Sequence, residues 1–142
     1  YGLRRRGARC VRGTPLSEQT LAHALDVYSD ASITVLHVIV YIEESYTAKA
    51  LVGDERLRER AQDRSADLLA EAEAKAAEHD REVETESEVG KSADENLEYA
   101  ETHGMDVIVI GSHGRSGVSR MLLGSVAETV MRRATSPVTV VR

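Results

Sequence analysis

The sequence predicts an α/β fold built on an open, doubly wound parallel sheet with helices on both faces. Apolar strand-like runs alternate along the chain with longer segments of helical periodicity. The runs at 32–39, 106–110 and 138–141 are rich in β-branched residues and nearly free of charge, as is typical of strands buried on both faces. Because helical segments separate these buried strands, we expect parallel pairing and two helical layers.

The first helix is expected to begin at Thr14 and Pro15. Threonine caps free backbone N–H groups, and proline suits the first helical position. Apolar residues then recur at helical spacing over about four turns. They form one apolar face, which consists of Leu21, Ala24, Leu25 and Tyr28.

A long helix is expected from Asp54 to about Asp80, after an irregular polar stretch at 41–53. Its composition is rich in Ala, Glu, Arg and Leu, which favours a helix with one buried side. That side is expected to consist of Leu57, Ala61, Leu68, Leu69, Ala72 and Ala76.

The second half of the chain is expected to add an edge strand and two more helices. Residues 82–89 alternate charged side chains with Val and Thr, which indicates a strand with one wet face. A helix should start at Lys91-Ser92 and run to about His103, with Gly104 as its stop. The last helix is expected over about 125–134.

The composition indicates one domain, residues 1–142, and argues against a nucleic-acid partner. The formal net charge is −6, and residues 13–142 carry 13 basic and 24 acidic side chains, a net charge of −11. A protein that holds a duplex through its phosphates needs a basic face. We therefore expect no nucleic acid among the partners.

A single cysteine, Cys10, excludes an intramolecular disulfide within this sequence, and no Cys/His cluster has metal-ligand spacing. No apolar run approaches the ~20 residues of a membrane-spanning helix. We therefore expect no metal site and no membrane association, and a cytoplasmic location.

The first twelve residues do not fit the predicted fold. A doubly wound sheet should begin with an apolar strand ahead of the Thr14 helix, yet residues 1–12 contain five arginines. Five charged side chains among twelve residues are not expected inside a sheet. Residues 1–12 are thus anomalous in place of the first strand. Two explanations stay open: a divergent N-terminus, or a segment translated from a shifted reading frame, which we favour because GC-rich DNA read out of frame yields Arg, Gly and Ala.

A glycine-rich loop follows the strand at 106–110, with the spacing Gly111-x2-Gly114-x9-Gly124-Ser125. Glycine leaves backbone N–H groups uncovered, and a helix N-terminus attracts anions, so the loop is a candidate phosphate site. A structural interpretation stands beside it. Ser125-Val-Ala-Glu128 has the form of a capping box, which alone would explain the serine.

Several segments resemble the universal stress protein family over residues 13–142. They are Thr14–Leu25, Val35–Ile39, Asp106–Arg115, Leu122–Glu128 and Ser136–Val141. The resemblance implies an adenine nucleotide alpha hydrolase-like fold with five parallel strands in the order 3-2-1-4-5. It also implies a homodimer formed through the last strand, residues 138–141.

The Gly-x2-Gly-x9-Gly-Ser pattern belongs to the ATP-binding branch of that family. The resemblance therefore implies ATP as the ligand, with Mg²⁺ as a candidate companion ion. The phosphates would be surrounded by Gly114, Arg115, Gly124, Ser125 and Val126. Ile110 and Gly111 would flank the nucleoside, and Val38 would meet adenine, although ordinary strand packing also explains a valine there.

The chain departs from the family where the ribose should be held. Family members end their first strand in an Asp that binds the ribose hydroxyls, whereas Arg12 stands there in this sequence. No catalytic constellation is visible, so we predict a dimeric, ATP-binding, nucleotide-dependent module of the stress response. The alternatives are a slow ATPase, an autophosphorylating enzyme with Ser116 or Ser125 as acceptor, and a dimer that has lost nucleotide binding.

Overall fold

The sheet contains five parallel strands in the order β3-β2-β1-β4-β5. A computed structural model describes residues 6–10, 15–39, 54–112 and 124–142 of the chain. The strands are β1 (Arg6–Cys10), β2 (Ser32–Ile39), β3 (Glu84–Val89), β4 (Val107–Gly111) and β5 (Val138–Val141). The predicted α/β class with parallel strands is confirmed, and the order is the one implied by the family resemblance.

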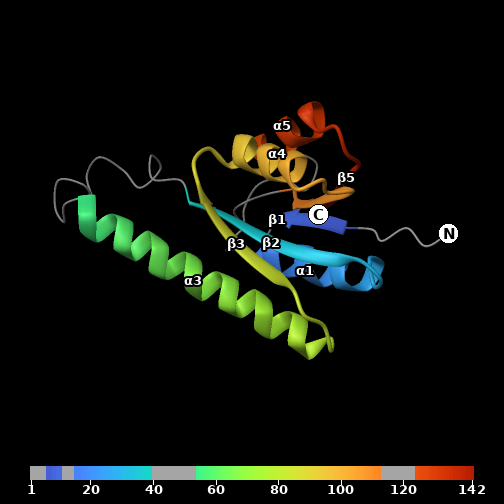
Figure 1. Ribbon diagram of the computed structural model, residues 1–142, viewed down its shortest axis with the longest axis horizontal. Helices are drawn as coiled ribbons and strands as arrows, with labels where there is room; N and C mark the ends of the chain where they lie inside the picture. Colours follow the sequence, from blue (N-terminus) through green and yellow to red (C-terminus); the bar gives the residue numbers. More distant parts are fainter. Residues whose placement is uncertain (1–5, 11–14, 40–53, 113–123) are drawn as a thin grey trace.

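Helices cover both faces of the sheet, as Figure 1 shows. On one face α1 and α3 pack together, and on the other face α4 packs against α5. The helices are α1 (Pro15–Val27), α3 (Asp54–Glu78), α4 (Ser92–Thr102) and α5 (Ser125–Arg133). Their bounds differ from the predicted ones by at most two residues, and β3 starts two residues later than predicted. The irregular segment expected at 41–53 lies outside the described residues.

The expectation that the arginine-rich segment cannot lie inside the sheet was wrong for residues 6–10. β1 is the central strand, with Arg6 to Cys10 paired to Ser32 to Leu36 of β2 and Gly7 to Arg9 paired to β4. The reason is that a ladder is made by backbone N–H and C=O groups, which every residue except proline supplies. Because β2 and β4 both offer such groups toward the strand between them, side-chain charge alone did not decide the pairing.

The side chains of β2 alternate between the two faces of the sheet and contribute to a separate apolar cluster on each face. Ile33 and Val35 lie in the cluster under α1 and α3, whereas Leu36 packs against Tyr99 of α4. Successive side chains of a strand point to opposite faces, so one buried strand supplies both clusters. A third cluster joins β4 to α4 and α5 through Ala100, Ile108, Ile110, Ala127 and Val130.

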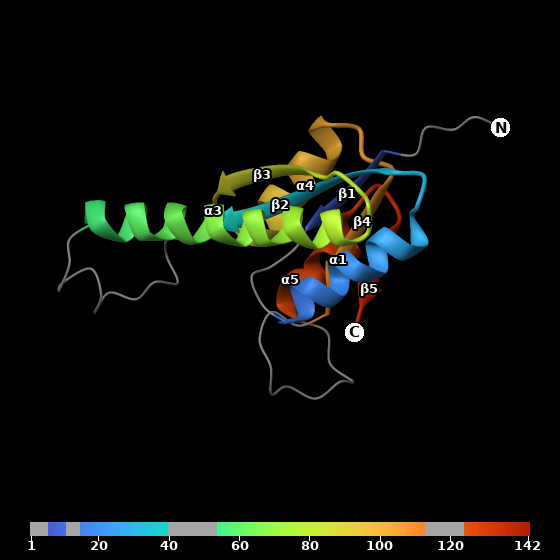
Figure 2. The same cartoon turned by 90° about the horizontal axis from the view of Figure 1, so that it is seen from below.

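Helix α3 is longer than the sheet that it covers. It has 25 residues, or ~37 Å at the rise of an α-helix, whereas the eight residues of β2 span ~26 Å. Figure 2 shows one end of α3 extending beyond the strands. Of the predicted buried side, Leu57, Ala61, Ala72 and Ala76 are buried, and Leu68 and Leu69 are half-buried.

The predicted end of the helix at Gly104 is confirmed, and the backbone conformation of Gly104 explains why α4 ends there. Gly104 has φ of +58°, a left-handed conformation that glycine adopts without steric cost. Its N–H donates to the Glu101 carbonyl at 3.2 Å, and the Met105 N–H donates to the Ala100 carbonyl at 2.9 Å. These two bonds form a Schellman motif, which satisfies the last carbonyls of α4.

The C-terminal end of α1 is satisfied by a side chain from a distant segment. Arg81, just ahead of β3, donates to the carbonyls of Leu25 at 2.9 Å, Tyr28 at 3.1 Å and Ala31 at 2.6 Å. A guanidinium beside exposed carbonyls also offsets the negative end of the helix dipole. Arg81 therefore fastens the turn between α1 and β2 to the chain that enters β3.

We expect Arg81→Ala to lower the free energy of unfolding by about 2–3 kcal/mol, because three carbonyls lose a charged donor. Urea denaturation followed by circular dichroism measures the change. Arg81→Lys keeps the charge but lacks the planar fork, so it should recover only part of the loss. A stability equal to that of the wild type in the alanine variant would contradict this role.

Candidate functional site

The candidate site lies at the carboxyl ends of β1 and β4, whose next described helices lie on opposite faces of the sheet. These two strands are neighbours in the sheet. The helix that follows β1 covers one face, and the helix that follows β4 covers the other. Ligands of open α/β sheets bind at such a switch point, outside the carboxyl ends of the strands. Gly111, the last residue of β4, lies at this edge, as the sequence predicts.

Ser112 holds the two ends of the glycine-rich loop together. Its N–H donates to the Val141 carbonyl at 2.8 Å, and its carbonyl accepts the N–H of Gly124. The residue is 2% exposed. Gly124, the residue before the first residue of α5, therefore lies beside Ser112. The sequence analysis did not single out Ser112; a small polar residue directly after a buried strand was the available signal.

The N-terminus of α5 is arranged differently from the predicted capping box. Gly124 is the N-cap, without a side-chain hydrogen bond, and its carbonyl accepts the Glu128 N–H at 3.0 Å. Ser125 is thus the first helical residue and is exposed. The capping interpretation was wrong because the helix begins one residue earlier than the box requires. The first N–H groups of α5 have neither a helical acceptor nor a cap from their own N-cap residue.

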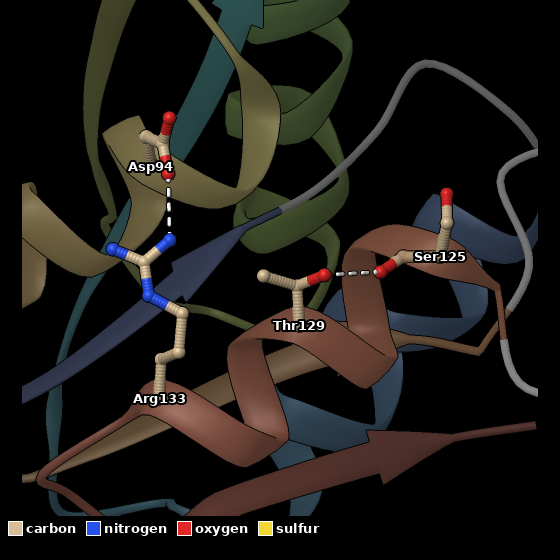
Figure 3. A network of polar contacts seen from close by, with 4 residues as sticks. All are labelled: Asp94, Ser125, Thr129 and Arg133. Atoms are coloured by element: carbon tan, nitrogen blue, oxygen red, sulfur yellow. Dashed lines mark hydrogen bonds and ion pairs between the residues drawn. The ribbon is translucent and has the colours of Figure 1, made fainter.

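Glu128 points along the helix rather than back to its start. Its carboxylate pairs with Arg132 at 2.7 Å. Figure 3 shows the Ser125 hydroxyl standing clear of the helix, while the Ser125 carbonyl accepts the Thr129 hydroxyl at 2.9 Å. The first turn of α5 therefore offers its backbone N–H groups and one free-standing hydroxyl to the site.

The second contact drawn in Figure 3 is an ion pair between α5 and α4. Arg133, in the last turn of α5, pairs with Asp94 in the first turn of α4 at 2.8 Å. Both side chains are more than half exposed, so the pair adds little stability. Apolar packing between the two helices does the larger part, because Ala100, Ala127 and Val130 share one cluster.

Six of the eight predicted site residues fall in the described part of the chain, and they approach one edge. Ile110 is 2% exposed and shares its cluster with Val126. Val38 packs against the neighbouring cluster of Leu36 and Tyr99. Met105 packs against both clusters, which lie on the same face of the sheet. Gly114 and Arg115 lie outside the described residues.

Val38 and Gly111 lie on either side of the carboxyl end of β1. Cys10, the last residue of β1, pairs with Leu36, and Val38 comes two residues later on β2. On the other side Arg9 pairs with Val109, and Gly111 comes two residues later on β4. Strands β2 and β4 therefore both extend beyond the last residues of β1 that pair with them.

Acidic side chains gather beside Val38. Glu88 is its partner on β3, and Glu95 lies one turn before Tyr99 on α4. Burial raises the pKa of the Glu95 carboxyl, and the charges of Glu98, Glu88 and Asp94 raise it further. Burial also raises the pKa of the Tyr99 hydroxyl, assisted by the three glutamates at 84, 86 and 88, against a hydrogen bond from Thr34 that lowers it.

The edge therefore carries opposite potentials at its two ends. Carboxylates surround the β3 side, near Val38, whereas the positive end of a helix dipole lies on the β4 side at Gly124. These potentials favour an elongated ligand whose anionic end lies at the N-terminus of α5. Its uncharged end would then lie toward Val38.

The described residues show no catalytic or metal-binding constellation. Within them, no group of three His, Cys, Asp or Glu side chains could hold a metal ion. Asp106 precedes the first residue of β4, at the edge opposite Gly111. His37 accepts or donates a hydrogen bond with Ser65 of α3 at 2.7 Å, on the face away from α5. None of the described helices is long and apolar enough to cross a membrane.

Comparisons with known proteins agree on one family. The family model described as the universal stress protein family matches residues 9–142. The chain is 31% identical to universal stress protein YxiE of Bacillus subtilis over 147 residues, covering 93% of this chain and 95% of that protein.

Solved structures share the fold. Universal stress protein UspA from Lactobacillus plantarum matches with a TM-score of 0.79 and 22% identity, over 97% of this chain and 99% of that one. A universal stress protein in complex with cAMP matches with a TM-score of 0.57 and 22% identity, over 96% and 97% of the two chains. An Arabidopsis thaliana family protein with AMP bound matches with a TM-score of 0.68 and 17% identity, over 96% and 90%.

We expect Glu95→Gln to stabilise the protein at neutral pH, because the raised pKa means that the folded state disfavours the charged carboxyl. In the wild type, stability rises as pH falls through the raised folded pKa toward the ordinary glutamate value, where the folded protein binds the proton first. The advantage of the variant should therefore disappear over that range. Chemical denaturation between pH 4 and pH 8 measures it.

A matched control separates this local effect from a change in net charge. Glu71→Gln removes one carboxylate from an exposed position of α3. An identical pH profile for the two variants would mean that the surroundings of Glu95 are not responsible.

Proposed function

The chain belongs to the universal stress protein family, and we propose that it is a dimeric ATP-binding module whose nucleotide occupancy regulates its interactions. The N-terminus of α5 carries this proposal. It begins with a glycine N-cap, has no side-chain cap, and lies at the switch point between β1 and β4. Such a helix end binds phosphate through backbone N–H groups and the helix dipole.

Ser125 and Ser112 support phosphate binding in different ways. The exposed Ser125 hydroxyl can donate to a phosphate oxygen, since it is not used as a cap. Ser112 keeps the first turn of α5 next to the end of β4 through its two backbone bonds. Gly114 and Arg115, which lie outside the described residues, are also proposed to contact the phosphates.

Adenine is the proposed base, at the end of the site near Val38. Two proteins with the same fold are named for bound cAMP and AMP, both adenine nucleotides. Val38 and Val126 are half-buried on one face of the sheet and offer apolar surface to a ring, and the buried Ile110 shares its cluster with Val126. The acidic groups on the β3 side favour an orientation in which the phosphates lie at α5.

The proposed dimer forms through β5, residues 138–141. β5 is the last strand at its edge of the sheet and is half-buried along its length. Among described residues, Val27, Val89 and Met131 are the large apolar side chains that are most exposed. Val27 and Met131 belong to α1 and α5, the two helices that pack against β5. A second copy pairing along this edge would cover apolar surface as well as backbone groups. We propose a cytoplasmic location for this dimer.

We expect Ser125→Ala to weaken ATP binding about tenfold, because one hydrogen bond to a charged phosphate is lost. Gly124→Val should weaken it at least as much by placing methyl groups where the backbone meets the ligand. Isothermal titration calorimetry with ATP, with and without Mg²⁺, measures both. Phosphate release in the same samples would reveal the alternative of a slow ATPase, and incorporation of labelled phosphate would reveal autophosphorylation.

Ser92→Ala is the matched control, because Ser92 is also the first residue of its helix. Neither alanine variant should change the melting temperature of the ligand-free protein by more than a degree or two. A Ser125→Ala variant that melts lower but binds ATP normally would restore the capping interpretation. Wild-type protein that binds no adenine nucleotide would leave the third alternative, a dimer without nucleotide binding.

We expect Met131→Lys to weaken self-association by adding a charge beside β5. Val89→Lys is its control, because Val89 is similarly exposed, 49% against 47%, and lies on the strand at the opposite edge. Sedimentation velocity over a range of concentrations measures both. Equal effects of the two substitutions would place the interface elsewhere.

A further inference from the structure

The residue after β5 lies beside the proposed phosphate site. Gly111, the last residue of β4, pairs with Val141 of β5. The N–H of Ser112, the residue after β4, donates to the Val141 carbonyl at 2.8 Å. Continuing the parallel register places Arg142 next to Ser112, at the usual strand separation of about 4.8 Å. Ser112 is in turn bonded to Gly124, the N-cap of α5. A single residue thus separates Arg142 from the helix end.

Arg142 is also free to bind an anion. It is exposed, and within the described ranges it has neither an ion-pair partner nor a side-chain hydrogen bond. The neighbouring arginines differ in this respect: Arg132 is paired with Glu128 and Arg133 with Asp94, toward the other end of α5. Of these three arginines in the described part of the chain, Arg142 is therefore the one without an ion-pair partner.

From this placement we infer that Arg142 is a further phosphate-binding residue of the nucleotide site, which neither the glycine-rich pattern nor the family resemblance includes. The inference rests on the proposed function. Arginine carries a permanent charge and can hold two phosphate oxygens at once. The phosphates would lie between its guanidinium and the N–H groups at the start of α5. Because the whole chain has a net charge of −6, a further local cation helps to attract a polyanion to this edge.

The test compares ligands that differ only in their phosphates. Calorimetry with ATP, ADP, AMP and adenosine is carried out on the wild type and on Arg142→Gln. We expect about a tenfold loss of ATP affinity in the variant, a smaller loss for ligands with fewer phosphates, and unchanged affinity for adenosine. The ATP affinity of the variant should also depend less steeply on salt.

Arg133→Gln is the matched control. It removes the same charge from the last residue of α5, far from the start of that helix, and its ion pair with Asp94 is exposed on both sides. It should leave ATP affinity within about twofold, because exposed pairs contribute little. An equal loss in both variants would mean that net charge is responsible and would overturn the inference.

Two further outcomes would also overturn it. An equal loss of affinity for adenosine and ATP would give Arg142 a structural role, and dissociation of the dimer in Arg142→Gln at the same protein concentration would give it an interface role. Normal ATP binding by the variant would reject the inference and leave the proposed function intact. If the wild type bound neither ATP nor adenosine, the proposed function would fail and the inference with it.

Discussion

The pairing of β1 with β2 and β4 holds the two halves of the sheet together. β2 and β3 form one pair, β4 and β5 form another, and only β1 joins them. Removing it would leave two narrow ribbons with unpaired inner edges, each exposing backbone groups that need partners. The candidate site depends on the same strand, because it lies at the end of β1 and between the strands that extend past it.

Most of the fold could be predicted from the sequence, because buried strands and amphipathic helices leave clear patterns. The apolar runs of β2, β4 and β5 occur in the structure, and Gly104 ends α4 as its left-handed conformation requires. The failure at β1 has a physical origin. Pattern-based prediction reads side chains, whereas a central strand can be specified by the backbone groups of the strands on either side. Nothing in residues 6–10 alone signals those neighbours.

The candidate site was predictable in outline and not in detail. The glycine spacing placed Gly111 at the end of a strand and Gly124 and Ser125 at the start of the next helix, and they lie at the end of β4 and the start of α5. That these residues bind a nucleotide stays a prediction. The interpretation of Ser125 as an N-cap was wrong because the same sequence, Ser-x-x-Glu, fits both a capping box and a helix whose first residue is the serine. Ser112 was missed for a related reason: its role is carried by backbone atoms, so its side-chain type gives little signal.

The charge around two similar helix ends explains why only one of them suits an anion. Helices α4 and α5 cover the same face, follow parallel strands and so begin at the same edge, and neither has a side-chain cap from its N-cap residue. The first turn of α4 contains Asp94, which is paired with Arg133, and Glu95, and Glu88 lies close to Glu95. The charges of Glu95 and Glu88 oppose an anion at this helix end, against the attraction of the helix dipole. At α5 the single first-turn acid is Glu128, which is neutralised by Arg132. The two helix ends thus differ in electrostatics rather than in backbone geometry, and that difference orients a nucleotide along the edge.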